Sequence, residues 1–193
     1  AVIDTMEQSD KVVVAAIHGT ALGGGLEVCL GTHYRVAVPS GKVGLPEVKL
    51  GLLPGAGGTQ RLPRLTGPAA ALEIMTSGRF VSAKEALKLG IIDEIAEQED
   101  VREAGLAFAN KLINDGAKPR RVSTLTDKLA DARRDRSVFD QARSTLEKTH
   151  RGQFSPFRIV DCVEAAVDLP EPVTLRAVLR IRVEGATHRS HLT

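Results

Sequence analysis

Apolar and polar positions follow two different periods along the first hundred residues, and each period predicts a different element. Residues 11–18 contain an unbroken apolar run that ends before Gly19, which predicts a buried β-strand. Shorter apolar stretches at residues 34–38 and 43–45 predict two more strands. A spacing of three to four predicts helical segments at residues 1–9, 24–31, 59–61, 68–76 and 83–89. Because strands and helices alternate, we expect a parallel sheet with crossover connections.

Several helix ends in this region carry their own signals. Ser82 precedes Glu85 by three residues, which is the spacing of a capping box at a helix start. Gly31 and Gly90 are placed to end the helices that precede them. Glu47 follows the third predicted strand, and we expect it on a loop.

Beyond residue 100 the apolar period is helical. It predicts helices at residues 100–115, 138–151 and 159–167. A basic, proline-containing linker at residues 118–121 separates the first two, and Pro156 is expected to set a break before the third.

These patterns divide the chain into three parts. Residues 1–118 are expected to form an α/β core and residues 119–169 a helical region. Residues 170–193 lose the pattern, and we expect an irregular, disordered tail that could reflect a frameshift. His188 and His191 in this tail have a helical spacing, but no acidic or thiol partner is near them in the sequence, so no metal site is expected.

The composition is that of an ordinary globular protein. Of 193 residues, 42% are hydrophobic and 26% charged, which argues against global disorder. The net charge of +2, with no Trp and one Tyr, gives no basis for nucleic-acid binding. Cys29 and Cys162 lack metal-ligand spacing, and we expect them to be reduced. No apolar run is long enough for a membrane span and no signal-peptide pattern is present, so we expect a cytoplasmic protein without a membrane partner.

The candidate chemistry lies between residues 12 and 60. A predicted strand leads to the triple glycine that begins at Gly23, and a predicted helix follows. The amides of a helix's first turn have no intrahelical acceptor, and glycines let a ligand oxygen approach them. Glu27 lies in that first turn, and Glu47 follows 20 residues later. Oriented amides with two carboxyl groups suit a reaction that forms an oxyanion and moves protons.

Three sequence stretches carry a family resemblance: HGTALGGGLEV, VGLPEVKLGLLPGAGGTQRL and SAKEALKLGIIDEI. They resemble the crotonase superfamily, and specifically the enoyl-CoA hydratases, closely over residues 1–97. Residues 119–170 resemble, more loosely, the region after the hydratase core of bifunctional enoyl-CoA hydratase/3-hydroxyacyl-CoA dehydrogenases of fatty-acid β-oxidation. The resemblance implies an α/β crotonase spiral of ββα turns with a helical C-terminal part.

The resemblance also implies roles for particular residues. Glu47 would supply the proton to C2 of a 2-enoyl thioester, and Glu27 would help to hold and activate the water. The amide of Gly24 would donate to the oxyanion. Water or substrate contacts are implied for Gly23, Pro46 and Gly55. No metal or redox cofactor is implied, because coenzyme A enters as part of the acyl-CoA substrate.

The match begins well inside the family's fold. We therefore expect that the first ββα turns are missing, together with the Ala-Gly-x-Asp stretch that usually gives the second oxyanion amide, in a fragment or a truncated protein. Relatives assemble as homotrimers through their C-terminal helices or are fused to a dehydrogenase region. Both arrangements are open for this chain, and a peroxisomal location is implied if the source is a eukaryote.

Other functions are kept open beside hydration. A Δ3-Δ2 enoyl-CoA isomerase needs one carboxylate to shuttle a proton, and bifunctional relatives do both reactions. An inactive remnant that binds acyl-CoA, or that only assembles with partners, is the third possibility. Taken singly, Glu27 could be a first-turn acid that only favours the helix dipole, and Glu47 could be a solvated charge.

The remaining polar motifs have structural interpretations. The glycines of residues 55–58 lack the Gly-Lys-Ser/Thr ending of a phosphate loop and are expected to serve close packing. His18 is expected to be structural. Arg133, Arg134 and Arg136 are expected on a solvated helix face, and contact with the coenzyme's phosphates is the weaker alternative.

Overall fold

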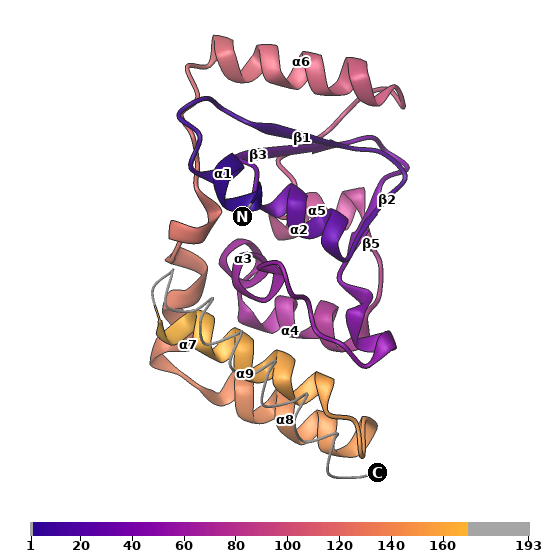
Figure 1. Cartoon of the computed structure of the whole chain (residues 1–193), viewed down its shortest axis with the longest axis vertical. Helices are drawn as coiled ribbons and strands as arrows, with labels where there is room; N and C mark the ends of the chain where they lie inside the picture. Colours follow the sequence, from indigo (N-terminus) through magenta and orange to yellow (C-terminus); the bar gives the residue numbers. More distant parts are fainter. Residues whose placement is uncertain (1, 170–193) are drawn as a thin grey trace.

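The computed structural model describes residues 2–169, which are arranged in layers along one long axis (Figure 1). Helix α6 (Val101–Asn114) lies at one end, across a three-stranded sheet. The sheet has the order β1 (Val14–Ile17), β3 (Tyr34–Ala37), β6 (Glu94–Ile95), and both strand pairs are parallel. The predicted strands at residues 11–18 and 34–38 are confirmed, each with shorter bounds.

A second sheet has the order β2 (Thr20–Leu22), β4 (Lys42–Gly44), β5 (Val81–Ser82). Strands β2 and β4 are parallel, but β4 and β5 are antiparallel. The expectation of parallel pairing is therefore confirmed for β1–β3, β3–β6 and β2–β4 and is wrong for β4–β5. The reason is that Gly78, shortly before β5, lies against Val48, which follows β4, so the chain enters β5 beside the end of β4.

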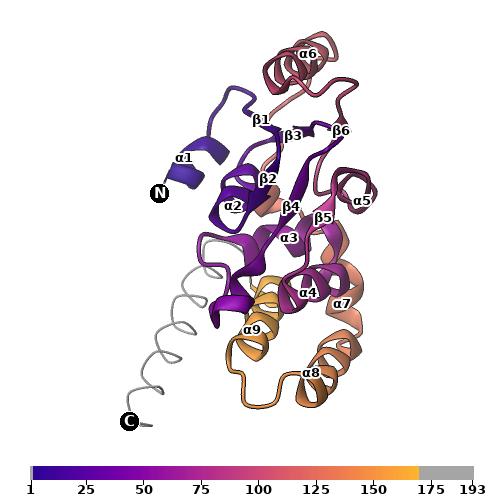
Figure 2. The same ribbon diagram turned by 90° about the vertical axis from the view of Figure 1, so that its right-hand side faces the viewer.

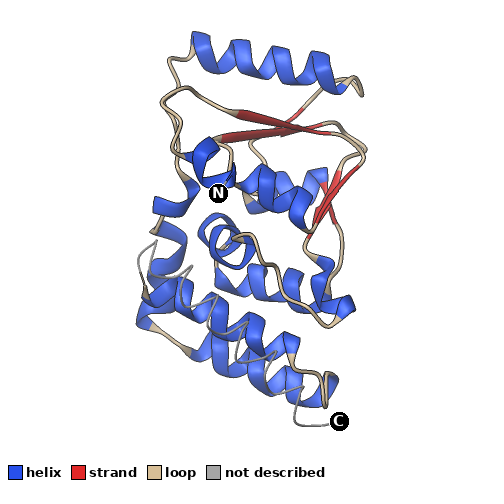
Figure 3. Ribbon diagram, in the orientation of Figure 1, coloured by secondary structure: helices blue, strands red, loops and turns tan. Residues whose placement is uncertain are grey.

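The predicted helices of the first hundred residues are all present, and Figure 3 shows how far helices outweigh strands. They are α1 (Val2–Glu7), α2 (Gly24–Leu30), α3 (Gly58–Thr66), α4 (Pro68–Ser77) and α5 (Ala83–Leu89). Helices α2 and α5 lie on the side of the first sheet opposite α6, and α3 and α4 form the next layer (Figure 1). The core between these layers is aliphatic, with fully buried side chains that include Leu26, Leu45 and Leu62.

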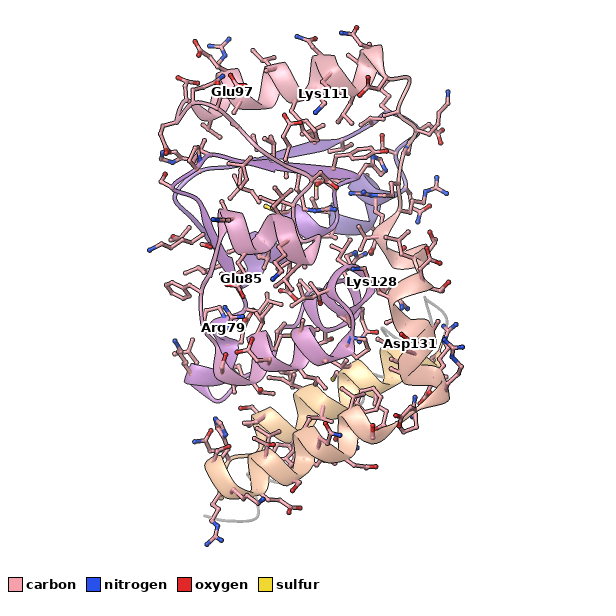
Figure 4. All side chains as sticks on the ribbon, turned by 180° about the vertical axis from the view of Figure 1, so that it is seen from behind. Arg79, Glu85, Glu97, Lys111, Lys128 and Asp131 are labelled. Atoms are coloured by element: carbon pink, nitrogen blue, oxygen red, sulfur yellow. The ribbon has the colours of Figure 1, made fainter. Side chains whose placement is uncertain are left out.

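The capping box at α5 is only half formed. The Ser82 hydroxyl accepts a hydrogen bond from the Glu85 amide at 3.3 Å, as predicted. The Glu85 carboxylate does not complete the box, because it accepts two hydrogen bonds from the Arg79 guanidinium, at 2.7 and 3.0 Å (Figure 4). A bidentate pair with Arg is a stronger alternative for the carboxylate than one backbone amide. Gly31 and Gly90 cap α2 and α5 as predicted.

The C-terminal part is a group of helices packed against α3 and α4 (Figure 2). Its elements are the 3₁₀ turns η2 (Val122–Thr124) and η3 (Asp127–Leu129) and the helices α7 (Ala130–Arg134), α8 (Ser137–Thr149) and α9 (Ser155–Asp168). Pro156 lies in the first turn of α9, so the predicted break is wrong. A first-turn position needs no backbone donor and therefore tolerates Pro.

Of the three arginines expected on a solvated helix face, two also contact α9. Arg133 Nε donates to the carbonyl of Val167 at 2.9 Å. Arg136 pairs with Glu164 at 3.1 Å and with Asp168 at 2.7 Å. Both side chains thus tie this segment to α9, which short-range sequence patterns do not reveal. Arg133 and Arg134 are exposed, and Arg134 pairs with Asp131 of its own helix. The expected solvated face is therefore confirmed for these two residues and is wrong only for the partly buried Arg136.

The structural histidine of the fold is His33, which is fully buried, whereas His18 is exposed. Nδ1 of His33 accepts from the amide of Val13 at 2.9 Å, so its proton lies on Nε2, which donates to the carbonyl of Glu7 at 3.0 Å. The structural role expected of His18 is therefore filled by His33.

Within residues 2–169, no helix is both long and apolar enough to cross a bilayer. The same residues hold no group of three potential metal ligands, and Cys29 and Cys162 are free thiols. The predicted tail at residues 170–193, with His188 and His191, lies outside the described residues.

Candidate active site

The site is built around the start of helix α2. Gly23, directly before the helix, has φ +55° and ψ −127°, a conformation that favours glycine. Its amide donates to the carbonyl of Gly44 at 2.9 Å, which fixes the turn to the end of β4. Gly24 is the first residue of α2, so its amide belongs to the first turn, where helix geometry supplies no acceptor.

Glu27 is buried in the first turn of α2, with 3% of the residue's surface exposed. Its Oε1 accepts hydrogen bonds from the amides of Ala56 and Gly58, at 2.7 and 2.8 Å. These donors come from the second glycine-rich turn, which therefore holds a carboxylate of the protein itself. A carboxylate that only interacted favourably with the dipole of its own helix would not require hydrogen-bond donors from another segment of the chain.

Glu47 lies in the 3₁₀ helix η1 (Pro46–Leu50) and not on a loop, which corrects the sequence expectation. Pro46 starts the turn, because its fixed φ suits a first helical position. The Glu47 carboxyl lies beside Gly23, where a Cβ would come within 3.3 Å of Glu47 Oε1. Its Oε2 is buried, and no residue within the described range 2–169 forms a hydrogen bond with it.

The environment favours the protonated form of Glu47. Burial raises the pKa of Glu47 above its ordinary value of 4.5, and the nearby charge of Glu27 raises this pKa further, while a backbone hydrogen bond opposes the shift. A carboxyl group with a raised pKa keeps its proton to a higher pH, which suits a group that donates a proton.

The structure thus brings Gly23, Gly24 and Glu47 together at the start of the helix that carries Glu27. Gly55 immediately precedes Ala56, whose amide binds Glu27. The sequence interpretation missed the amides of Ala56 and Gly58 as donors to Glu27. Only the clustering of glycines in this stretch signals that a carboxylate can approach the backbone there.

A groove of about 380 Å³ lies elsewhere, between helices α4 and α8. Its lining is mainly apolar and includes Leu72, Val138 and Leu146, but none of the predicted site residues. Since chemistry needs the polar groups described above, the groove is not the candidate active site.

The raised pKa of Glu47 predicts a pH-dependent cost to stability. The native state keeps a proton that the unfolded chain has lost, so the free energy of unfolding falls as pH rises from about 4.5 through the raised pKa. Glu47→Gln removes this dependence. We expect its stability, relative to the parent, to increase over that interval and then level off, as measured by urea unfolding at several pH values.

The matched control for this prediction is the exposed Glu147 of α8. Glu147→Gln makes the same chemical change at an exposed position, and its stability relative to the parent over the same pH interval serves as the reference. A difference for Glu47→Gln that does not change with pH would show that the Glu47 carboxyl is not perturbed.

Known proteins resemble this chain in sequence and in fold. The chain is 46% identical over 169 residues to a peroxisomal bifunctional enzyme of Cavia porcellus, matching 88% of this chain and 23% of the relative. It is 41% identical over 171 residues to a fatty acid oxidation complex subunit alpha of Shewanella baltica, matching 86% of this chain and 24% of the relative. The chain therefore spans about a quarter of the length of these curated relatives.

Solved structures agree with the sequence comparison. An enoyl-CoA hydratase from Bacillus anthracis superposes with a TM-score of 0.55 at 29% identity, covering 80% of this chain and 66% of that chain. The expected crotonase fold is confirmed by this likeness. The family model described as enoyl-CoA hydratase/isomerase matches residues 2–154, and the chain accordingly belongs to the enoyl-CoA hydratase/isomerase family.

Proposed function

We propose that the chain forms the hydration site of an enzyme that converts trans-2-enoyl-CoA to 3-hydroxyacyl-CoA. The observation that carries this proposal is the pairing of two carboxyl groups with different environments. Glu27 is fixed by two backbone amides, while Glu47 has a raised pKa and a buried oxygen without a hydrogen bond from any described residue.

In the proposed reaction, water adds across the double bond of the substrate. Glu27 orients the water, whose oxygen forms the bond to C3, and Glu47 gives its proton to C2. The proton that leaves the water returns to the pair of carboxyl groups, so the pair ends with as many protons as it had at the start. General acid–base catalysis of this kind contributes about 10²–10⁴-fold to a rate.

The negative charge that develops on the thioester oxygen would be stabilised by the amide of Gly24. This amide points out of the first turn of α2, where the helix dipole also favours negative charge. One such donor contributes about 10²–10³-fold to the rate. Gly23, Pro46 and Gly55 are proposed to line the positions of the water and the substrate.

No metal or redox cofactor enters this proposal, because coenzyme A arrives as part of the substrate. The names of the relatives, a peroxisomal bifunctional enzyme and a fatty acid oxidation complex subunit, favour a role in fatty-acid β-oxidation. Fusion to a 3-hydroxyacyl-CoA dehydrogenase region or assembly into a homotrimer, and a location in the cytoplasm or the peroxisome, stay predictions.

The test is to mix the protein with crotonyl-CoA and follow the loss of the conjugated-thioester absorbance. We expect turnover to 3-hydroxybutyryl-CoA. If the absorbance stays constant while a 3-enoyl-CoA is converted to its 2-enoyl isomer, the site is an isomerase and hydration is wrong. If neither substrate reacts but titration calorimetry detects acyl-CoA binding, the chain is a binding module.

A further inference from the structure

We infer that Arg61 is a positioning residue for Glu27, acting through the glycine turn at residues 55–58. The inference rests on the proposed function for its catalytic meaning. Arg61 is 3% exposed, lies in helix α3, and is not adjacent to either glutamate in the sequence. Its side chain turns back along α3 and lies against the segment whose amides hold Glu27.

The contact between Arg61 and the turn is at Gly57. A Cβ at Gly57 would be only 2.1 Å from Arg61 Nη1, so the guanidinium occupies the space that any other side chain would need. Gly57 also has φ +106°, in the left-handed region that favours glycine. Both the backbone conformation and the contact with the Arg61 guanidinium therefore favour glycine at position 57.

The peptide unit between Gly57 and Gly58 joins this contact to the carboxylate. Its N–H donates to Glu27 Oε1 at 2.8 Å, and its carbonyl oxygen accepts from the amide of Arg61 at 2.9 Å. A rotation of this peptide would break both hydrogen bonds at once. The guanidinium fills the space beside Gly57, so it limits displacement of the Gly57 backbone toward it and helps to keep this peptide unit in place.

The guanidinium is itself held by a buried ion pair. Arg61 Nη2 pairs with Glu7 Oε2 at 2.6 Å, and Glu7 is 2% exposed. The other oxygen of Glu7 accepts from the amide of Ser123 at 2.8 Å, and its carbonyl accepts from His33. A buried pair with these additional hydrogen bonds keeps one geometry, because separating the charges would leave each of them buried alone.

The four contacts form one continuous connection from α1 to the site. Glu7 holds Arg61, Arg61 packs against Gly57, and the neighbouring amides hold Glu27. A carboxylate that must aim a water has to keep its orientation closely, and a small displacement lowers the rate without preventing substrate binding. Loss of Arg61 should therefore act on kcat and leave KM nearly unchanged.

The test uses the double variant Glu7→Gln/Arg61→Met, which removes both charges of the buried pair and so avoids leaving one of them unpaired. We expect kcat for crotonyl-CoA hydration to fall at least tenfold with KM within about twofold of the parent. The single variant Arg61→Lys keeps the positive charge but loses the planar group under Gly57, and an intermediate loss in kcat is expected.

The matched control is Arg64→Met. Arg64 lies on the same helix, is also 3% exposed, and donates to the carbonyl of Ala166 on α9, near the C-terminal end of α3 and away from the glycine turn. This variant should lose thermal stability without a change in kcat. If Arg64→Met and the Arg61 variants lower kcat equally at matched stability, the effect is one of stability and the inference is overturned.

A second measurement does not depend on turnover. Hydrogen exchange of the Ala56 and Gly58 amides, measured by NMR and normalised to amides of helix α5, should accelerate at least tenfold in the Arg61 variants and not in Arg64→Met. Unchanged exchange would overturn the positioning role even if kcat falls. If the parent chain does not hydrate crotonyl-CoA, the proposed function fails, while the exchange result still decides whether Arg61 orders the turn.

Discussion

Glu47→Gln is expected to lower kcat for hydration of crotonyl-CoA by about 10²–10⁴-fold, with KM within a few fold of the parent. Gln has nearly the shape of Glu but no acidic proton, so C2 of the substrate would lose its proton donor. The buried position of Glu47 Oε2 and the raised pKa of the Glu47 carboxyl support its proposed role as the proton donor. The measurement is steady-state loss of the thioester absorbance.

Glu147→Gln serves as the control for this prediction, because it makes the same chemical change at an exposed position on α8. It should hydrate at the parent rate. Parent-like turnover by Glu47→Gln would show that the proton comes from another group. Urea unfolding of Glu47→Gln at the pH of the assay checks that a loss of turnover does not come from unfolding.

Glu27→Gln is expected to have the second large effect, a fall in kcat of about 10²–10⁴-fold. The amide oxygen of Gln can still accept from Ala56 and Gly58, but it cannot take a proton from water. Glu27→Asp tests the geometry, since a carboxylate that is one methylene shorter cannot keep both hydrogen bonds, at 2.7 and 2.8 Å, without moving the backbone. We expect Asp to restore little of the activity.

The control for Glu27 is Glu103→Gln, a change at another acidic residue in the first turn of a helix, on the exposed side of α6. Both glutamates lie in the first turn of a helix, where the helix dipole stabilises a negative charge. If the two variants lose stability and activity alike, Glu27 serves only its helix. If Glu27→Gln alone loses turnover, the carboxylate takes part in the reaction.

The sequence predicted correctly those helix ends that depend on residues next to them in the chain. The start of α2 follows from the conformation of Gly23, and the start of α5 follows from the Ser82 cap. Gly31, at the end of α2, has an ordinary φ of −82°, but a Cβ there would lie 2.3 Å from Ile3 Cγ2. Placement of Glu47 failed, because a 3₁₀ turn of five residues is too short to show a period. Pro46, directly before Glu47, is the sequence signal that favours a helical turn over a loop at this position.

Contacts between distant residues were beyond the sequence patterns. Glu7 and Arg61 are 54 positions apart, and each resembles an ordinary charged residue on a helix. His33 was overlooked for the same reason, since burial depends on the layers above and below it. The interpretation of Glu27 as part of a site came from the motif, but its donors in the second glycine turn became visible only in three dimensions.

Helix α9 has a practical consequence for anyone who shortens this protein. The family model ends at residue 154, one residue before the helix begins. Yet Gln60 and Arg64 of α3 donate to backbone carbonyls of Cys162 and Ala166 in α9. A chain that ended at residue 154 would expose those two polar side chains and the aliphatic surface around them. Both side chains belong to α3, and the first amide of α3 donates to Glu27. Expression trials should therefore keep the chain at least to Asp168.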